Sequence, residues 1–173
     1  MPEEKLLFVE KELKRWKRPE SPKLGTALVF IGGKKPVVVY EGERGPTQGE
    51  LLWGKYNTFY EVDMGDRSLE LEEKLPFADG LEFRAKVELT YAVSDPALIV
   101  NDRITDAGQL KKQAIKVMRR TSREYTYEQI GEAENIIAAI IKDEVREKGF
   151  KPIISAFVEI SGDKEISQIK KIV

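Results

Sequence analysis

The sequence contains no cysteine and no histidine, and these two absences exclude the most chemistry. Without these residues the chain has no disulfide, no thiolate nucleophile, no imidazole base and no zinc site with nitrogen or sulfur ligands. Any catalysis would have to depend on carboxylate, lysine, tyrosine or serine side chains. Long apolar runs are also lacking: the longest uncharged stretch near the start, residues 24–33, has ten residues, whereas a membrane-spanning helix needs about 20.

The charges of the two signs nearly cancel. The 173 residues include 29 Lys and Arg against 30 Asp and Glu, a formal net charge of -1, so no overall basic field favours nucleic acid or a membrane. Hydrophobic residues make up 41% of the chain, which is enough for the core of one domain. Charged residues interrupt the first apolar residues, so no signal peptide is recognised, and the cytoplasm is the predicted location.

Near the N-terminus, apolar residues recur every three or four positions, which predicts an amphipathic helix over residues 4–17. Its apolar face comprises Leu6, Val9, Leu13 and Trp16. This face is a candidate for docking on the domain itself, on a partner helix or on a membrane surface. Pro19 and Pro22 end the predicted helix, so residues 1–24 are expected to form a helix and a linker.

The next part of the chain alternates between short apolar runs and turns, which is typical of antiparallel strands. Residues 27–31 and 37–40 flank a Gly-Gly-Lys-Lys turn and predict a β-hairpin. Further strands are expected at residues 50–53, 58–64 and 68–71. The clearest strand is residues 81–93, where the odd positions are apolar and most even positions are polar, so one face meets a core and the other meets water.

Beyond this strand the apolar period becomes helical. A helix is expected over residues 96–101, a second is expected to be capped by Asp106, and a capping box at Thr126–Gln129 opens a third. Residues 153–161 return to a strand that is expected to be mostly buried on both faces, and Asp163 is expected to cap a last helix.

This order predicts an α+β domain over residues 25–162, with a mainly antiparallel β-rich first half, helices packed on the sheet and a final strand. Residues 163–173 would begin a C-terminal helix.

Two groups of residues suggest ligand chemistry, and each has a simpler explanation. Gly32–Lys35 resembles a phosphate cradle, but it lies between two strands and no Ser or Thr follows its lysines, so a hairpin turn is preferred. An acidic cluster comprises Asp63, Asp66, Glu70, Glu72 and Glu73. It is compatible with a hard cation or an acid/base pair, but carboxylates spaced by two also describe the solvated face of a strand, which is preferred. The sequence therefore predicts no catalytic residue, no cofactor and no metal.

Residues 107–123 carry a local charge of +6 with no acidic residue. The basic residues are Lys111, Lys112, Lys116, Arg119, Arg120 and Arg123. They are candidates for contact with an acidic face of the same or a neighbouring subunit, with anionic lipid or with nucleic acid. Residues 61–88 hold nine Asp and Glu against four Lys and Arg, so a subunit contact is preferred. Nucleic acid is disfavoured because no recognition motif accompanies the basic helix.

Several motifs follow one another in order between residues 37 and 160. They are Glu50-Leu51-Leu52-Trp53-Gly54-Lys55-Tyr56, Tyr60-Glu61-Val62-Asp63-Met64, the strand ending in Val93-Ser94-Asp95-Pro96, the basic helix leading to Tyr125-Thr126-Tyr127-Glu128-Gln129-Ile130, and Val145-Arg146-Glu147-Lys148-Gly149-Phe150 followed by Phe157-Val158-Glu159-Ile160. Together they resemble the SPFH domain, the band-seven module of stomatins, prohibitins and flotillins.

The resemblance implies a non-enzymatic scaffold whose copies assemble side by side at a membrane and bind membrane proteins, including membrane proteases. The chain departs from the family pattern at its start, where a charged helix stands in place of a hydrophobic anchor, and at residues 163–173, which are too short for the usual coiled coil. We therefore expect a self-associating, membrane-associated scaffold that organises membrane proteins. The alternative is a soluble protein-binding module of the same fold without membrane attachment.

Overall fold

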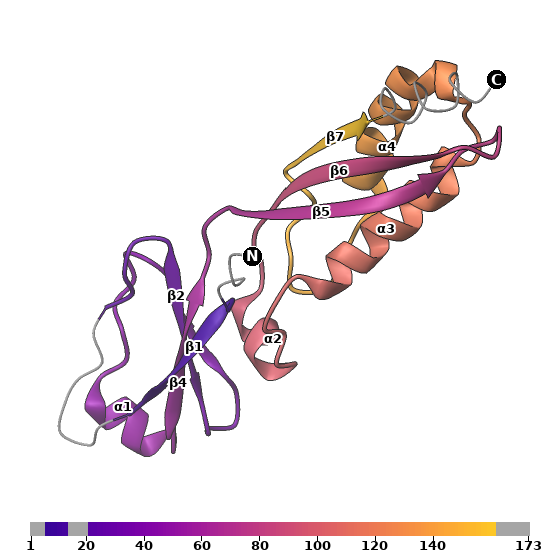
Figure 1. Cartoon of the computed structure of the whole chain (residues 1–173). Helices are drawn as coiled ribbons and strands as arrows, with labels where there is room; N and C mark the ends of the chain where they lie inside the picture. The colour runs from indigo at the N-terminus through magenta and orange to yellow at the C-terminus, as the bar shows by residue number, and fades with distance from the viewer. Residues whose placement is uncertain (1–5, 14–20, 162–173) are drawn as a thin grey trace. The chain divides into compact units, whose positions relative to one another are not determined.

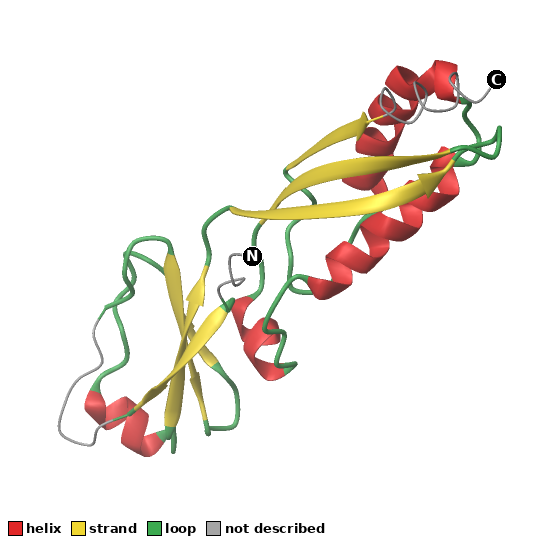
Figure 2. Ribbon diagram, viewed as in Figure 1, coloured by secondary structure: helices red, strands yellow, loops and turns green. Residues whose placement is uncertain are grey.

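The computed structural model describes residues 6–13 and 21–161, which form two antiparallel sheets and the helices that accompany them (Figures 1 and 2). These residues divide into two compact units. Unit 1 takes the described residues up to 65 together with residues 92–106 and 148–150, and unit 2 takes residues 66–91, 107–147 and 151–161. The chain therefore passes between the units several times.

Unit 1 is built on a sheet of four described strands in the order β1-β4-β2-β3. The strands are β1 (Phe8–Glu12), β2 (Thr26–Ile31), β3 (Val37–Val39) and β4 (Thr58–Asp63). The predicted hairpin is confirmed, because β2 and β3 pair antiparallel with Leu28 opposite Val39. Strand β4 lies between β2 and β1, and its Val62 is opposite both Ala27 and Phe8.

Helical segments accompany this sheet. They are α1 (Gln48–Trp53), whose Leu51 joins a core cluster with Leu28 and Phe30 of β2, and α2 (Pro96–Asn101), which lies against β2 and β3. Because successive side chains of a strand point to opposite faces, burial of Val29 as well as Leu28 and Phe30 means that β2 is covered on both faces.

Two expectations for unit 1 are wrong. Residues 8–12 form strand β1 rather than part of a helix, because β4 offers them an edge and tertiary pairing outweighs the weak helical period of a short segment. Residues 50–53 belong to helix α1 rather than to a strand. The hydroxyl of Thr47 accepts a hydrogen bond from the Glu50 amide at 3.2 Å and its carbonyl accepts one from the Leu51 amide at 3.1 Å, which starts a helical turn.

Unit 2 is built on a sheet of three described strands in the order β5-β6-β7, with helices on one face (Figure 1). The elements are β5 (Arg67–Pro76), β6 (Glu82–Tyr91), α3 (Gly108–Ser122), the 3-10 helix η1 (Tyr127–Gln129), α4 (Ile130–Glu144) and β7 (Ser155–Ser161). Helix α3 packs along β5, α4 packs along β7, and the two helices contact each other. Phe83, Val87 and Leu89 of β6 are buried on the helix side, so the predicted alternation of this strand is confirmed.

The helix starts of the second half are largely as predicted. Helix α2 has the predicted bounds, and the Asp95 carboxylate caps it by accepting a hydrogen bond from the Leu98 amide at 3.2 Å. The capping box at Thr126 and Gln129 is present. The N-cap of α3 is Ala107 and not Asp106, one residue later than predicted.

Strand β7 is buried on one face only, which corrects the expectation of burial on both faces. Its Val158 and Ile160 face the helices, whereas Phe157 and Glu159 are exposed, because α3 and α4 both lie on the same side of the sheet. The α+β fold, with antiparallel sheets, packed helices and a final strand, is confirmed. The helix expected over residues 163–173 lies outside the described residues.

Candidate functional site

Helix α3 presents a basic face opposite its buried face. Its buried residues are Leu110, Ala114, Val117, Met118, Thr121 and Ser122. Lys112, Lys116 and Arg123 lie on the side of the helix away from these residues, and Lys111 is also exposed. All six predicted basic residues are exposed, but they are spread around the helix and have different surroundings.

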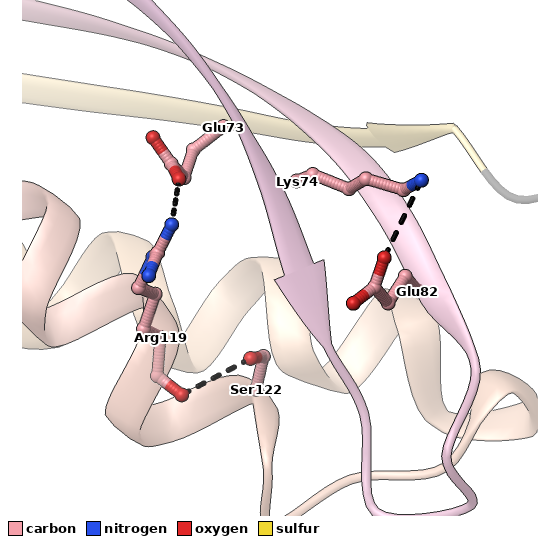
Figure 3. Close-up of polar contacts among 5 residues, drawn as sticks. All are labelled: Glu73, Lys74, Glu82, Arg119 and Ser122. Carbon is pink, nitrogen blue, oxygen red and sulfur yellow. Dashed lines mark hydrogen bonds and ion pairs between the residues drawn. The ribbon is translucent and has the colours of Figure 1, made fainter.

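Two of the six basic residues form ion pairs within unit 2. The guanidinium of Arg119 forms an ion pair with the carboxylate of Glu73 on β5 (Figure 3), and Arg120 forms one with Glu144 of α4 at 2.7 Å. The remaining four form no ion pair with any described residue. We call Lys111, Lys112, Lys116 and Arg123 the α3 basic face.

Helix α4 lies beside α3 and carries charge of the opposite sign. Its exposed residues include Glu132 and Asp143, which lie on the same side of the helix because they are eleven positions, about three turns, apart. Ile136, 40% exposed, lies between them. The helical layer of unit 2 therefore presents a basic helix and an acidic helix side by side.

The other face of the unit 2 sheet is open to solvent, since within the described residues the helices cover only the opposite side. It carries glutamates from all three strands and one aromatic ring, together with Arg84 and Lys86 of the middle strand β6. In the cross-strand register, Glu70 of β5 lies opposite Glu88 of β6, and Glu88 lies opposite Phe157 of β7. Phe157 is 65% exposed, and Glu159 follows it on the same face. We call Glu70, Glu88, Phe157 and Glu159 the acidic sheet patch.

This patch is not predicted from the sequence. Glu70 belongs to a predicted cluster of neighbours in sequence, and Phe157 and Glu159 are expected in a strand mostly buried on both faces. The alternation of apolar and polar residues over Ser155–Ser161 is the signal that distinguishes one buried face from two. The pairing with Glu88, however, depends on the register between β6 and β7.

The predicted acidic cluster is dispersed. Asp63 is in unit 1, where its carboxylate accepts a hydrogen bond from the Gly65 amide at 2.9 Å. Glu72 pairs with Lys86 at 3.5 Å, and Glu73 with Arg119. Glu70 and Glu72 are exposed on β5, as expected for the solvated face of a strand. Among the described residues, no group of three or more acidic side chains is placed to hold a metal ion.

The Gly32–Lys35 segment is a hairpin turn, as predicted, and its glycines are needed for packing. The ring of Tyr56 lies against the turn, and the Tyr56 hydroxyl donates a hydrogen bond to the Lys35 carbonyl at 3.0 Å. A Cβ on Gly33 would lie 2.5 Å from the Gly54 carbonyl oxygen and 2.8 Å from the Tyr56 ring. The turn is therefore filled by its own chain and offers no phosphate cradle.

The predicted N-terminal docking face is not the face of a helix. Leu6 and Val9 are 60% and 55% exposed. Leu13 is partly buried against the core cluster of Leu28 and Phe30, and Trp16 lies outside the described residues. The role of this segment in docking on a membrane or a partner stays a prediction.

The candidate sites are therefore broad, charged surfaces on an α+β scaffold. Residues 24–168 match the family model described as SPFH domain / Band 7 family, so the chain belongs to that family. Its members are generally membrane-associated, non-enzymatic scaffolds. Among curated proteins, none matches the sequence at a significant level. Over the described part of the chain, every helix is too short or too polar to cross a bilayer.

Proposed function

We propose that this protein is a self-associating scaffold domain that works at a membrane surface and organises or regulates membrane proteins. Family membership supports the scaffold role, because SPFH proteins typically self-associate and interact with membrane proteins. The observation that carries self-association is the α3 basic face, where four cations point to solvent without an ion pair among the described residues.

The neighbouring helix supplies the complementary charge. If a second copy approaches the helical layer, the α3 basic face of each copy can lie against Glu132 and Asp143 of α4 in the other. Such a contact uses the same surface twice, which is the arrangement of a two-fold interface. Ile136 would be covered at the same time, which adds apolar area to the charge pairing.

The test is sedimentation velocity over a range of concentrations and salt. We expect association at about 50 mM salt that weakens at about 500 mM, because surface charges are screened within a few ångström at high ionic strength. The double variant Lys112→Glu/Lys116→Glu should be monomeric. Lys34→Glu/Lys35→Glu, which reverses two exposed lysines of the hairpin turn in unit 1, is the matched control and should associate like the parent.

A charge-swap experiment identifies the contact. Glu132→Lys/Asp143→Lys should also be monomeric alone and should associate when mixed with Lys112→Glu/Lys116→Glu, because the two surfaces are then complementary again. A parent protein that stays monomeric at low salt and high concentration would overturn the proposal.

The membrane part of the proposal is tested separately, by co-sedimentation with vesicles rich in phosphatidylserine. Binding that is lost at high salt supports peripheral attachment. If the protein associates but does not bind vesicles, the alternative is favoured: a soluble protein-binding module of the same fold, for which the open face of the unit 2 sheet remains available.

A further inference from the structure

Strand β7 has a free edge. It pairs antiparallel with β6 over its whole length, Ser155 to Ser161, and within residues 6–13 and 21–161 no strand pairs with its other side. Such an edge exposes main-chain N–H and C=O groups that can bind another extended chain.

The direction of these groups follows from a single contact. The Ile160 amide donates a hydrogen bond to the Glu134 carboxylate of α4 at 2.9 Å, so it points away from β6. Because the main-chain groups of a strand alternate between its two sides, those of Ala156 and Val158 point the same way. Glu134 occupies the end of the edge at Ile160, while Ala156 and Val158 make no backbone hydrogen bond outward to any other described segment.

The side chains next to this edge select the charge of an incoming chain. Phe157 and Glu159 project from β7 onto the open face of the sheet, and Glu88 stands opposite Phe157. Glu70, Glu88 and Glu159 form no ion pair with a described residue, and Glu159 lies opposite Lys86 in the register. On the same face, Glu72 pairs with Lys86, and Glu82 pairs with Lys74 (Figure 3). An exposed ring bordered by carboxylates that form no ion pair with a described residue attracts a cation, both through its π-face and through the carboxylates.

We infer that the β7 edge binds an extended, lysine- or arginine-bearing segment of a partner protein, which adds a strand next to Ala156 and Val158. Side chains of an added strand alternate, so every second one lies on the open face beside Phe157 and Glu159. A cationic side chain at that position contacts both. The hydrogen-bonded backbone supplies affinity without regard to sequence, and the acidic sheet patch supplies selectivity for positive charge.

The inference goes beyond self-association, because it uses a different face of unit 2 from the α3 basic face. It names the kind of segment that a scaffold of this type would hold. An acidic segment would be repelled by the patch, and a helix has no free main-chain groups with which to pair with the edge.

The probe is a short fluorescein-labelled peptide of alternating lysine and valine, titrated into the full chain and followed by fluorescence anisotropy. We expect saturable binding. Peptides of alternating glutamate and valine, and of alternating lysine and proline, are the controls. The first has the wrong charge and the second cannot donate from every other residue, so both should fail to bind.

Three variants separate the contributions of the strand edge, the Phe157 ring and the Glu159 carboxylate to peptide binding. Ala156→Pro removes an outward-facing N–H at an edge, where proline is tolerated, and should abolish binding while leaving the circular dichroism spectrum unchanged. Phe157→Ala should weaken binding roughly fivefold through loss of the cation–π contact. Glu159→Gln should weaken it by a similar factor, whereas Glu43→Gln, at an exposed loop carboxylate in unit 1, should have no effect.

A nitrogen-15 NMR titration locates the bound peptide and shows whether each variant is folded. The amides of Ala156 and Val158 should shift more than any on β5, which is the opposite edge of the sheet. The inference is overturned if the peptide does not bind, if Ala156→Pro binds as tightly as the parent, or if the glutamate peptide binds equally well. Lys112→Glu/Lys116→Glu should bind the peptide like the parent, so loss of self-association and loss of peptide binding are separate results.

Discussion

The two sheets of this protein are covered differently. Strand β2 of unit 1 is buried over four consecutive residues, Ala27 to Phe30, because both faces of this strand are covered. Strand β6 of unit 2 alternates without interruption between buried and exposed residues until Thr90, because helices lie on one face only. The inner strand of the unit 2 sheet therefore has one charged face open to solvent, and the acidic sheet patch lies on that face.

The difference in coverage between β2 and β6 is tested most strongly by placing a glutamate at adjacent positions of each strand. In β2, Leu28→Glu and Val29→Glu should each cost about 4 kcal/mol or more, because both side chains are buried and an unpaired charge in a core is severely destabilising. In β6, Ala85→Glu should cost as much, whereas Arg84→Glu should change stability by no more than about 0.5 kcal/mol.

Urea unfolding followed by circular dichroism measures these differences. If Leu28→Glu and Val29→Glu differed as strongly as Arg84→Glu and Ala85→Glu, one face of β2 would be open to water and the contrast between the sheets would be wrong.

The hairpin turn at Gly33 in unit 1 is also more closely packed than the turn at Gly80 in unit 2. The expected effect on stability is smaller than for the strands. Gly33→Ala should cost about 2–3 kcal/mol, because its new Cβ would overlap the Gly54 carbonyl and the Tyr56 ring. Gly80, in the β5–β6 turn, has a φ of +83°, and apart from its chain neighbours nothing lies within 4 Å of the point that a Cβ would occupy. Gly80→Ala should therefore cost only about 1 kcal/mol, through backbone strain.

Thermal unfolding of both variants distinguishes packing from backbone strain. Gly80→Asn should recover most of the loss, since asparagine tolerates a positive φ, while Gly33→Asn should be no better than Gly33→Ala. Equal losses for Gly33→Ala and Gly80→Ala would mean that Tyr56 moves aside without cost.

Ion pairs between neighbouring strands give the smallest expected effect. Lys11 and Glu61 of unit 1 lie 3.0 Å apart, with side chains 38% and 21% exposed, whereas Lys86 and Glu72 of unit 2 lie 3.5 Å apart and are 61% and 54% exposed. Double-mutant cycles with Lys→Met and Glu→Gln should give a coupling of about 1 kcal/mol in the first pair and about 0.3 kcal/mol in the second. A larger coupling in the second pair would contradict an open sheet face in unit 2.

Local signals predict a large part of the fold. The alternation over residues 81–93, the Asp95 cap and the Thr126 capping box depend on residues a few positions apart, so they can be recognised without knowing what surrounds them. The hairpin at residues 27–40 is predictable for the same reason.

The wrong predictions concern segments whose structure depends on contacts with residues distant in sequence. The apolar spacing of residues 4–17 fits a helix, yet residues 8–12 become a strand because β4 provides an edge more than 40 residues along the chain. Residues 50–53 have the composition of a strand, but Thr47 starts a helical turn whose Leu51 packs on β2.

The sequence is enough to predict the α+β class, the family, the position of most strands and helices, and the concentration of positive charge on one helix. Which of those charges are neutralised depends on the folded structure, where Arg119 meets Glu73 and Arg120 meets Glu144. The folded structure also decides that Glu70, Glu88 and Phe157 lie in one row. The physical reason is that helix period and capping act between neighbours in sequence, whereas strand register and ion pairing join residues that only folding brings together.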